Sequence, residues 1–284
     1  MNKRKWLGSG LLLVTAIVWG FCFVVQRTGM DYVGPFTYGA SRFLLGAAAL
    51  LPLTLLRRPD RETRRRSIRA GVPCGVLLFL GTSLQQAGLQ TVSAGKAGFL
   101  TALYIVLVPL LGLFLKQKVH ARVWISAVLG AAGLYLLCVG EGGAGGMQTG
   151  DWLLIAGALM FAMHIQYVDH VAAGADSLVL SCAQYFTVAA LSAVAMLLTE
   201  KPTWAAISDC MPMILYGGLV SIAIGYTLQV VAQKITPPAV ASVMMCLESV
   251  FATLSGWLVL GEMLSLREGI GAAVMLCAAL LAQL

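Results

Sequence analysis

The segment LLIAGALMFAMHI, residues 153–165, decides the class of fold that the sequence predicts. It contains apolar and small residues apart from His164, and it does not alternate between apolar and polar positions. A strand of a membrane β-barrel alternates over about ten residues, whereas an unbroken apolar run favours a helix. Residues 271–282, GAAVMLCAALLA, follow the same pattern. Similar runs of roughly 18–22 residues recur along the chain, and each is long enough to cross about 30 Å of hydrocarbon.

The composition of the chain agrees with a membrane environment. Of its 284 residues, 59% are hydrophobic and 11% are charged, and the mean hydropathy is +0.87. An average soluble domain has about 25% charged residues. Because so few charges cannot cover the surface of a soluble protein of this length, the sequence predicts an all-α integral membrane protein.

The lengths of the apolar runs, interrupted by proline, glycine and clusters of charge, predict ten membrane-spanning helices. The predicted spans cover residues 7–26, 35–56, 70–90, 94–115, 121–139, 151–171, 177–198, 211–232, 237–260 and 266–283. Most connections between them are short, which leaves no room for a separate soluble domain. The first apolar run is too long for a signal peptide and lacks a clear cleavage site, so we expect an uncleaved first helix.

Lysine and arginine divide unequally between alternate connections, and this division predicts the orientation of the chain. One set of connections holds Lys3, Arg4, Lys5, Arg57, Arg58, Arg61, Arg64, Arg65, Arg66, Arg69, Lys116, Lys118, Arg122 and Lys234. The other set holds only Arg27, Lys96, Lys201 and Arg267. Because cytoplasmic connections carry the excess of positive charge, both termini should be cytoplasmic.

The net charge of +7 follows from these connections and does not indicate a nucleic-acid partner. The richest connection, RRPDRETRRR at residues 57–66, is predicted to be a solvated cytoplasmic loop that fixes the topology; binding of nucleic acid or an anionic lipid is the alternative. Seven cysteines are scattered without a CxxC pair, so we expect neither a disulfide framework nor a metal site. No motif indicates an ATP site, and no cofactor is expected.

The ten predicted spans form two sets of five with similar patterns. The matched segments are TAIVWGFCFVV (15–25) over GALMFAMHIQY (157–167) and SRFLLGAAALL (41–51) over AQYFTVAALSA (183–193), both shifted by 142 residues, and ALYIVLVPLLGLFLKQ (102–117) over LESVFATLSGWLVLGE (247–262), shifted by 145. An odd number of spans inverts the second copy. We therefore expect two inverted five-helix repeats, residues 1–139 and 140–284, with a binding site near the membrane midplane and halves that rock around it.

Several of these segments carry a family resemblance. The segments are WGFCFVVQ (19–26), SRFLLGA (41–47), TSLQQAGLQTVSAGKAGFLTALYIVLVPLLG (82–112), GDWLLIAGALMFAMH (150–164) and LESVFATLSGWLVLGEMLSLREGIGAAVMLCAALL (247–281). Together they resemble the EamA-type transporters of the drug/metabolite transporter superfamily, over essentially the whole chain. The last segment includes the pair Gly261–Glu262, which is typical of the end of that domain.

The resemblance implies a ten-helix carrier of small metabolites, often amino acids moved outward, across the inner membrane. The chain departs from the family in two places. Ser249 stands where many members have a proline, and Lys116–Gln117 stands where the first copy often has Gly-Glu. Known members carry chemically diverse substrates, so the resemblance does not name the substrate.

Polar and aromatic residues inside the predicted spans are the candidates for a substrate site, because polar groups in hydrocarbon must find partners or water. The candidate substrate-binding residues are Trp19, Arg42, Gln86, Tyr104, His164, Tyr185, Tyr226 and Glu248. Gln26 shares a helix face with Trp19 and Phe23, and this aromatic face either bounds a pocket or packs the core. Glutamines that share one helix face, such as Gln86 and Gln90, either line a wet pathway or bond across helices.

The two charges among the candidates each have two interpretations. Arg42 either binds a substrate carboxylate or is a structural charge near the outer end of its helix. Glu248 either pairs across helices, with Arg42 or Lys96, or lies in a low-dielectric cavity where it binds a proton. His164 either titrates or is a neutral histidine bonded within the bundle. Lys96 is predicted to snorkel toward the membrane surface.

The sequence therefore predicts a secondary transporter, most plausibly an exporter of amino acids or related metabolites, that is not an enzyme. Its expected partners are a small-molecule substrate and the lipid bilayer, with proton coupling as an option, and the chain would act as a monomer or homodimer. A channel or a lipid-translocating protein is the alternative. A membrane-embedded enzyme is disfavoured, because the three histidines form neither an HExxH nor an HxxxH motif.

Overall fold

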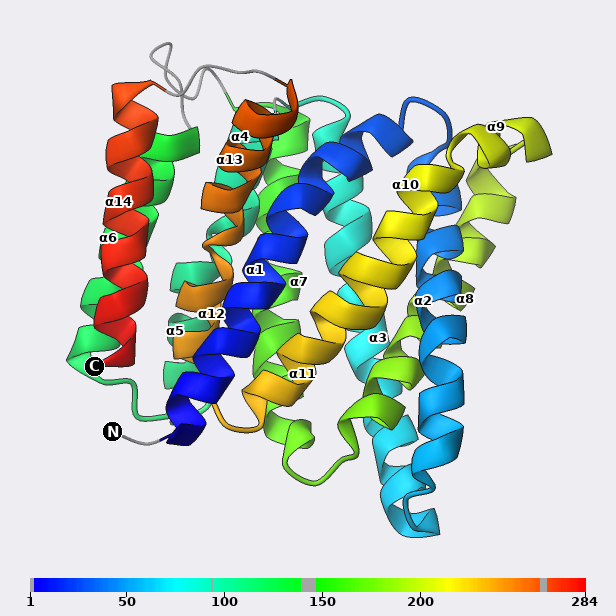
Figure 1. Cartoon of the computed structure of the whole chain (residues 1–284), viewed down its shortest axis with the longest axis horizontal. Helices are drawn as coiled ribbons and strands as arrows, with labels where there is room; N and C mark the ends of the chain where they lie inside the picture. The colour runs from blue at the N-terminus through cyan, green and yellow to red at the C-terminus, as the bar shows by residue number, and fades with distance from the viewer. Residues whose placement is uncertain (1–2, 93, 139–146, 261–264) are drawn as a thin grey trace.

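The computed structural model describes residues 3–92, 94–138, 147–260 and 265–284, and these residues form a bundle of helices that contains no strand (Figure 1). Ten helical segments are long and apolar enough to cross a membrane. The chain is thus an all-α, multi-pass membrane protein, as the sequence predicts. Seven spans are single helices: α1 (Lys3–Gly29), α2 (Pro35–Arg57), α3 (Arg61–Leu89), α6 (Ala121–Cys138), α7 (Thr149–Ala172), α8 (Ser177–Thr199) and α14 (Leu266–Gln283).

The remaining three spans are each built from shorter helices. They comprise α4 (Ala94–Ala102) with α5 (Tyr104–Phe114), α10 (Met211–Leu215) with the π-helix η1 (Tyr216–Tyr226) and α11 (Thr227–Gln233), and α12 (Pro238–Met245) with α13 (Glu248–Leu260). A short helix, α9 (Trp204–Asp209), connects α8 to α10. The spans predicted over residues 94–115 and 237–260 are confirmed, but the interruption inside each was not predicted.

The breaks in the two fourth spans lie at matching places in the repeats. The shift of 145 places Ala102, which ends α4, over Leu247, which lies between α12 and α13. At the first break the N–H of Val106 bonds to the carbonyl of Leu103 instead of that of Ala102. The freed Ala102 carbonyl accepts a hydrogen bond from Cys246 Sγ at 3.4 Å. A side chain at the second break thus satisfies a backbone carbonyl that the first break frees.

Both termini lie at the same end of the bundle, at the bottom of Figure 1. We call this end the termini face; it contains the connections at residues 58–60 and 173–176. The opposite end, the distal face, contains residues 30–34 and 90–92. The two termini are expected to lie at the same face, because an even number of spans returns the chain to the face where it started.

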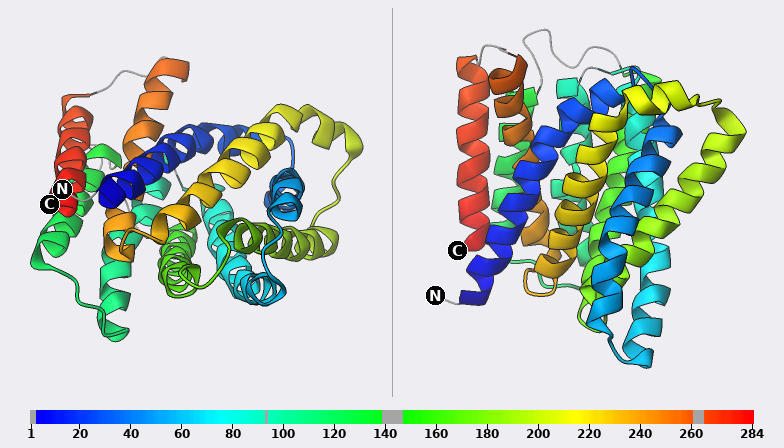
Figure 2. Two further views of the ribbon diagram at one scale, coloured as in Figure 1. Left: turned by 60° about the horizontal axis from the view of Figure 1, so that its bottom comes forward. Right: turned by 45° about the vertical axis from the view of Figure 1, so that its right-hand side comes forward.

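Equivalent helices of the two repeats pack in pairs. The pair α6–α14 lies at one edge of the bundle and the pair α2–α8 at the opposite edge (Figure 1 and Figure 2). Gly133 and Gly271 allow α6 and α14 to approach closely, because a Cβ atom on either would lie 2.7–2.8 Å from the carbonyl of the other. The third span of the first repeat, α3, packs against the first span of the second repeat, α7. In the same way, the third span of the second repeat, η1 with α11, packs against α1. Two inverted repeats are expected to show such matching contacts.

One charged segment differs from its prediction. The run at residues 57–66 is helical from Arg61 onward, because Asp60 caps α3 by accepting hydrogen bonds from the backbone of Glu62 and Thr63 at 3.0 and 2.9 Å. The prediction of a loop over this whole run is wrong, although its arginines are exposed as expected. The pair Gly261–Glu262 and the boundary at residues 139–140 lie outside the described residues.

Candidate functional site

A cavity of about 50 Å³ lies between the two repeats and is lined by helices of both. A water molecule needs about 10–15 Å³ by this measure, so the cavity has room for a few waters or a small chemical group. Six of the eight candidate substrate-binding residues line it: Trp19, Arg42, Tyr104, His164, Tyr226 and Glu248. The fold thus brings together residues that are far apart in the sequence.

The other two candidates are buried but do not line the cavity. Gln86 is 2% exposed, and its Nε2 donates to Gln26 Oε1 at 3.1 Å. Tyr185 is fully buried, and its hydroxyl lies 2.9 Å from Thr227 Oγ1. Each therefore contacts a neighbouring helix.

Arg42 is a buried cation without a carboxylate partner. Its side chain is 3% exposed, and Nη1 donates to Gln26 Oε1 at 2.7 Å. Its guanidinium lies 4.9 Å from the ring centroid of Tyr38 and 5.3 Å from that of Phe43. The ion pairs in the described parts of the chain are formed by other residues, and Arg42 Nε has no hydrogen-bond partner there. The guanidinium therefore retains capacity for an anionic group.

Glu248 is a buried carboxylate that faces the same cavity. It is 6% exposed, and Oε1 accepts a hydrogen bond from the Tyr104 hydroxyl at 2.9 Å. Glu248 begins α13 and Tyr104 begins α5, so this bond joins the two broken spans immediately after their breaks. The N-terminal position of Glu248 is electrostatically favourable, because the helix dipole is positive there.

Pairing of Glu248 with Arg42 or Lys96, one of its two interpretations, does not occur. Lys96 instead bonds to Asp151, with Nζ 2.7 Å from Oδ2. The lysine side chain is 15% exposed and that of Asp151 is fully buried. The prediction that Lys96 snorkels is therefore wrong, because a buried carboxylate at the start of α7 holds it within the bundle.

Aromatic side chains form one wall of the cavity. The rings of Trp19 and Tyr226 are 4.5 Å apart, and Trp19 Nε1 donates to the carbonyl of Ser221 at 3.3 Å. Ser221 lies in the π-helix η1, where the backbone departs from regular α-helical bonding. The ring of His164 meets that of Tyr226 edge-on at 6.4 Å.

His164 is bonded within the bundle, in agreement with one of its two interpretations. Its Nε2 lies 3.0 Å from Gln184 Oε1, and the histidine is 1% exposed. The shift of 142 places Arg42 over Gln184. Each of these matching residues contacts the first helix of its own repeat: Arg42 bonds to Gln26 on α1, and Gln184 bonds to His164 on α7. This correspondence gives the site a pseudo-symmetric framework with a charge on one side.

Sequence reasoning understated Gln26. The side-chain oxygen Oε1 of Gln26 accepts hydrogen bonds from both Arg42 and Gln86, and it so joins α1, α2 and α3. The signal was its shared helix face with Trp19. The cavity-lining residues Thr101 and Met245 gave no such signal, because single small or apolar residues occur throughout the spans.

Metal binding finds no support in the described part of the chain, where no three histidine, cysteine or acidic side chains gather. The polar groups of the cavity instead suit a small organic molecule.

Comparison with known families agrees with this arrangement. The sequence model of the EamA-like transporter family matches the chain twice, over residues 6–139 and 148–284. The chain belongs to this family.

Relatives of this EamA-like transporter have similarly general names. An "Uncharacterized transporter" of Archaeoglobus fulgidus is 30% identical over 284 residues, which cover 99% of this chain and 87% of that protein. The "Uncharacterized inner membrane transporter YedA" of Escherichia coli K12 is 28% identical over 167 residues, which cover 57% of this chain and 53% of that protein. A solved crystal structure with 20% sequence identity superposes with a TM-score of 0.79 over 96% of both chains and shows the same fold.

Proposed function

We propose that this EamA-like transporter is a secondary transporter that exports amino acids or closely related zwitterions by alternating access. The observation that carries the proposal is a pair of opposite charges, Arg42 and Glu248, that line one cavity without an ionic partner among the described residues. Unpaired buried charges are costly in a membrane and mark functional sites by default. A zwitterion supplies a counter-charge to each.

The substrate carboxylate binds the guanidinium of Arg42, whose planar donors match a carboxylate with two parallel hydrogen bonds. The substrate ammonium binds Glu248, whose Oε1 already accepts one hydrogen bond from Tyr104. Trp19 and Tyr226 form the wall beside them and favour a compact apolar or aromatic substrate side chain. Because the cavity of about 50 Å³ is smaller than an amino acid, substrate entry requires the two halves to move apart.

Glu248 also couples transport to protons in this proposal. A buried carboxyl group without a cation can exchange a proton when one face of the cavity opens to water. Proton binding and ammonium binding at the same carboxylate exclude each other, which is the requirement for antiport. Export through the inner membrane, with both termini in the cytoplasm, completes the proposal.

The test is a thermal-shift screen of the purified protein against amino acids, followed by counterflow in proteoliposomes. Saturable flux that is stimulated by substrate on the opposite side supports a carrier. Conductance without saturation would identify a channel, and scrambling of labelled headgroups would identify lipid translocation.

A substitution tests the charge assignment separately. Arg42→Ala should weaken binding of carboxylated compounds far more than that of their amide analogues. Equal losses for both classes would make Arg42 a structural residue.

A further inference from the structure

Two pairs of glutamines occupy matching positions near the ends of the third spans of the two repeats. A shift of 143 residues places Gln86 over Gln229 and Gln90 over Gln233. Gln90 directly follows α3, and Gln233 is the last residue of α11. Because the repeats are inverted, Gln90 lies at the distal face and Gln233 at the termini face.

The packing of two glycines supports this register. Gly8, near the start of α1, lies against the side chain of Ile235, just beyond α11. Gly150, which is 142 residues later at the start of α7, lies against the side chain of Val92, just beyond α3. The same contact therefore occurs at both ends of the molecule, between matching elements.

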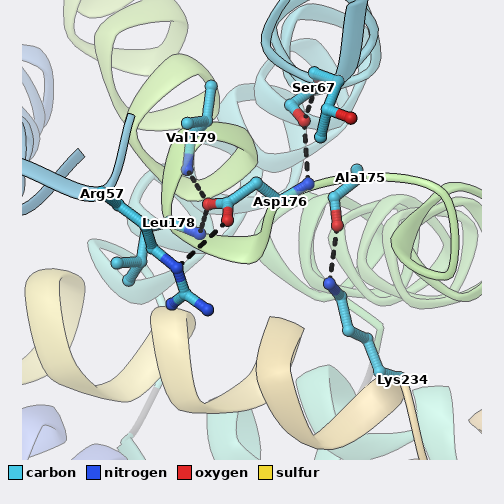
Figure 3. A network of polar contacts seen from close by, with 8 residues as sticks. Arg57, Ser67, Ala175, Asp176, Leu178, Val179 and Lys234 are labelled. Atoms are coloured by element: carbon cyan, nitrogen blue, oxygen red, sulfur yellow. Dashed lines mark hydrogen bonds and ion pairs between the residues drawn. The ribbon is translucent and has the colours of Figure 1, made fainter. Parts of the chain in front are cut away.

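At the termini face, the end of α11 is bonded to α7, the first helix of the same repeat, and to the connection that follows α7. Gln233 is 3% exposed, and its Nε2 donates to the carbonyl of Ile165 in α7 at 2.9 Å. The next residue, Lys234, donates from Nζ to the carbonyl of Ala175 at 2.6 Å (Figure 3). These two bonds hold α11 against α7 and the connection that follows it.

The same connection is bonded on its other side. Figure 3 shows Asp176 between Arg57 and Ser67: its Oδ2 lies 3.4 Å from Arg57 Nε, and its N–H donates to Ser67 Oγ at 2.8 Å. The α7–α8 connection is thus tied to α2, α3 and the end of α11 at once.

The distal face lacks the matching bonds. Gln90 is exposed, and within the described ranges its side chain forms no hydrogen bond, although Phe23, the residue that matches Ile165, lies on α1. The helix packing shows the same asymmetry between the termini face and the distal face. The contacts of α7 with α11 and α12 have no counterpart of similar extent between α1 and α3 or α4 in the described helices.

We propose that Gln233 and Gln90 are alternating latches of the transport cycle. In this structure Gln233 latches the termini face, and the distal face is unlatched. Each latch joins two cross-repeat units, because η1 and α11 pack on α1 whereas α3 packs on α7. When these two units rock against each other, Gln233 releases the carbonyl of Ile165, and Gln90 donates its amide to the carbonyl of Phe23. The inference rests on the alternating access proposed above, and it assigns the two residues as positioning residues rather than substrate contacts.

Each latch contributes one hydrogen bond between helices to one state of the cycle. Gln233 Oε1 also accepts a hydrogen bond from Gln229 at 3.0 Å, but that bond lies within α11. Loss of one such bond between helices changes the ratio of the two states by about two- to tenfold, the equilibrium factor of a single protein hydrogen bond. A two-state equilibrium responds to any interaction made in one state alone. Removing the termini-face latch should therefore populate the state that is closed at the distal face.

The experiment is hydrogen–deuterium exchange on the full chain in lipid nanodiscs, without substrate. In Gln233→Leu, exchange should rise at the termini-face ends of α7 and α11 and fall at the distal ends of α1 and α3, by about two- to tenfold. The double variant Gln233→Leu/Gln90→Leu should restore exchange at both faces toward wild type. The matched control is Asp31→Asn, an exposed distal-face residue; combined with Gln233→Leu, it should restore nothing.

The outcomes are distinguishable. A rise in exchange at both faces of Gln233→Leu means that its amide is only structural and overturns the proposal. A double variant that matches Gln233→Leu also overturns it, because Gln90 then makes no latch. Should Gln233→Leu fail to fold, Gln90→Leu decides the matter, because its exposed side chain predicts a folded protein. Loss of the distal latch depopulates the state that is open at the termini face, so exchange at the termini-face ends of α7 and α11 should fall by about two- to tenfold. Wild-type exchange there would overturn the proposal.

This readout is independent of the substrate. If no amino acid is transported but the reciprocal exchange pattern appears, the assigned substrate class is wrong and the latches stand. If transport is confirmed without that pattern, the latches are wrong and the transporter stands.

Discussion

Glu248 is the residue on which the proposed coupling depends, because it is a buried carboxylate whose described protein partner is the Tyr104 hydroxyl. Glu248→Gln keeps an oxygen that can accept this bond but removes the exchangeable proton. We expect uptake into proteoliposomes to lose its dependence on a pH gradient. Substrate exchange without a gradient should persist at lower affinity, because the amide oxygen still accepts a hydrogen bond from the substrate ammonium but carries no charge. Glu268→Gln is the matched control, because Glu268 is a half-buried member of the capping box at the start of α14, where it accepts a hydrogen bond from the backbone of Ser265. A Glu248→Gln protein with unchanged gradient dependence would exclude the coupling role.

Lys96 and Asp151 should contribute to stability rather than to transport. Lys96→Met removes the cation from Asp151 and leaves the N–H of Gln148 as a partner of its carboxylate, so folded-state stability should fall by about 1.5–3 kcal/mol, the contribution of a hydrogen bond to a charged group. The double variant Lys96→Met/Asp151→Asn should recover much of this loss, because no buried charge remains. Thermal unfolding in detergent measures both effects. A single variant as stable as wild type would show that Asp151 finds water or another partner.

At this scale the sequence could predict which polar residues lie inside the bundle, but not their partners. Six candidates line the cavity because intramembrane polar groups must face the interior. The partner of Lys96 could not be read from spacing, since Asp151 is 55 residues away on another helix. Gln26 was undervalued for the same reason: its role depends on contacts with α2 and α3.

Among the helices, α3 begins about two turns earlier than expected, and its cap explains why. Hydrogen bonds from the Thr63 hydroxyl, and then from the backbone of Thr63 and Glu62, hold the pKa of Asp60 below its usual value. The folded state therefore gains stability from ionised Asp60 above the unfolded-state pKa, and this gain is lost as pH falls through the lower folded-state pKa.

The prediction is that acidification through this range frays the start of α3 before the spans unfold. Hydrogen exchange at residues 61–66 measures it. Asp60→Asn keeps an oxygen acceptor but does not titrate, so its exchange should be insensitive to pH over the same interval after correction for intrinsic rates. Identical pH profiles for the two proteins would contradict the assignment.

The breaks in the fourth spans escaped prediction because no local sequence signal marks them. Pro109 lies inside α5 rather than at its start, and Ser249 occupies the place where many family members carry a proline. The breaks depend on the contact between Ala102 and Cys246, which joins residues 144 positions apart. Apolar length alone predicts one continuous helix in each case.

For the whole molecule, the charge asymmetry predicts that the termini face is cytoplasmic. A green fluorescent protein fused after Leu284 should fluoresce, and alkaline phosphatase inserted after Tyr32 at the distal face should be active. The reverse pattern would invert the transport direction proposed here. Removal of the positive charges at residues 57–69 should weaken this preference, because short positively charged connections resist translocation.

The architecture was the most predictable property of the chain. Apolar length, charge placement and an approximate internal repeat were sufficient for ten spans and two inverted halves, since a membrane allows few alternatives. The asymmetry between the two faces was not predictable. An internal sequence repeat predicts two equivalent halves and therefore two equivalent faces. The structure shows a single conformational state, in which the contacts at the two faces differ.

Glu200, at the end of α8, has a consequence for biosynthesis. Its carboxylate accepts hydrogen bonds from the backbone of Phe36 and Thr37 at 2.8 Å each, and so completes the start of α2. These donors are synthesised more than 160 residues before their acceptor. Until Glu200 is synthesised, the N–H groups of Phe36 and Thr37 lack this partner, and water or other groups must satisfy them. A gene split between the halves should yield a stable N-terminal fragment only when its partner is co-expressed.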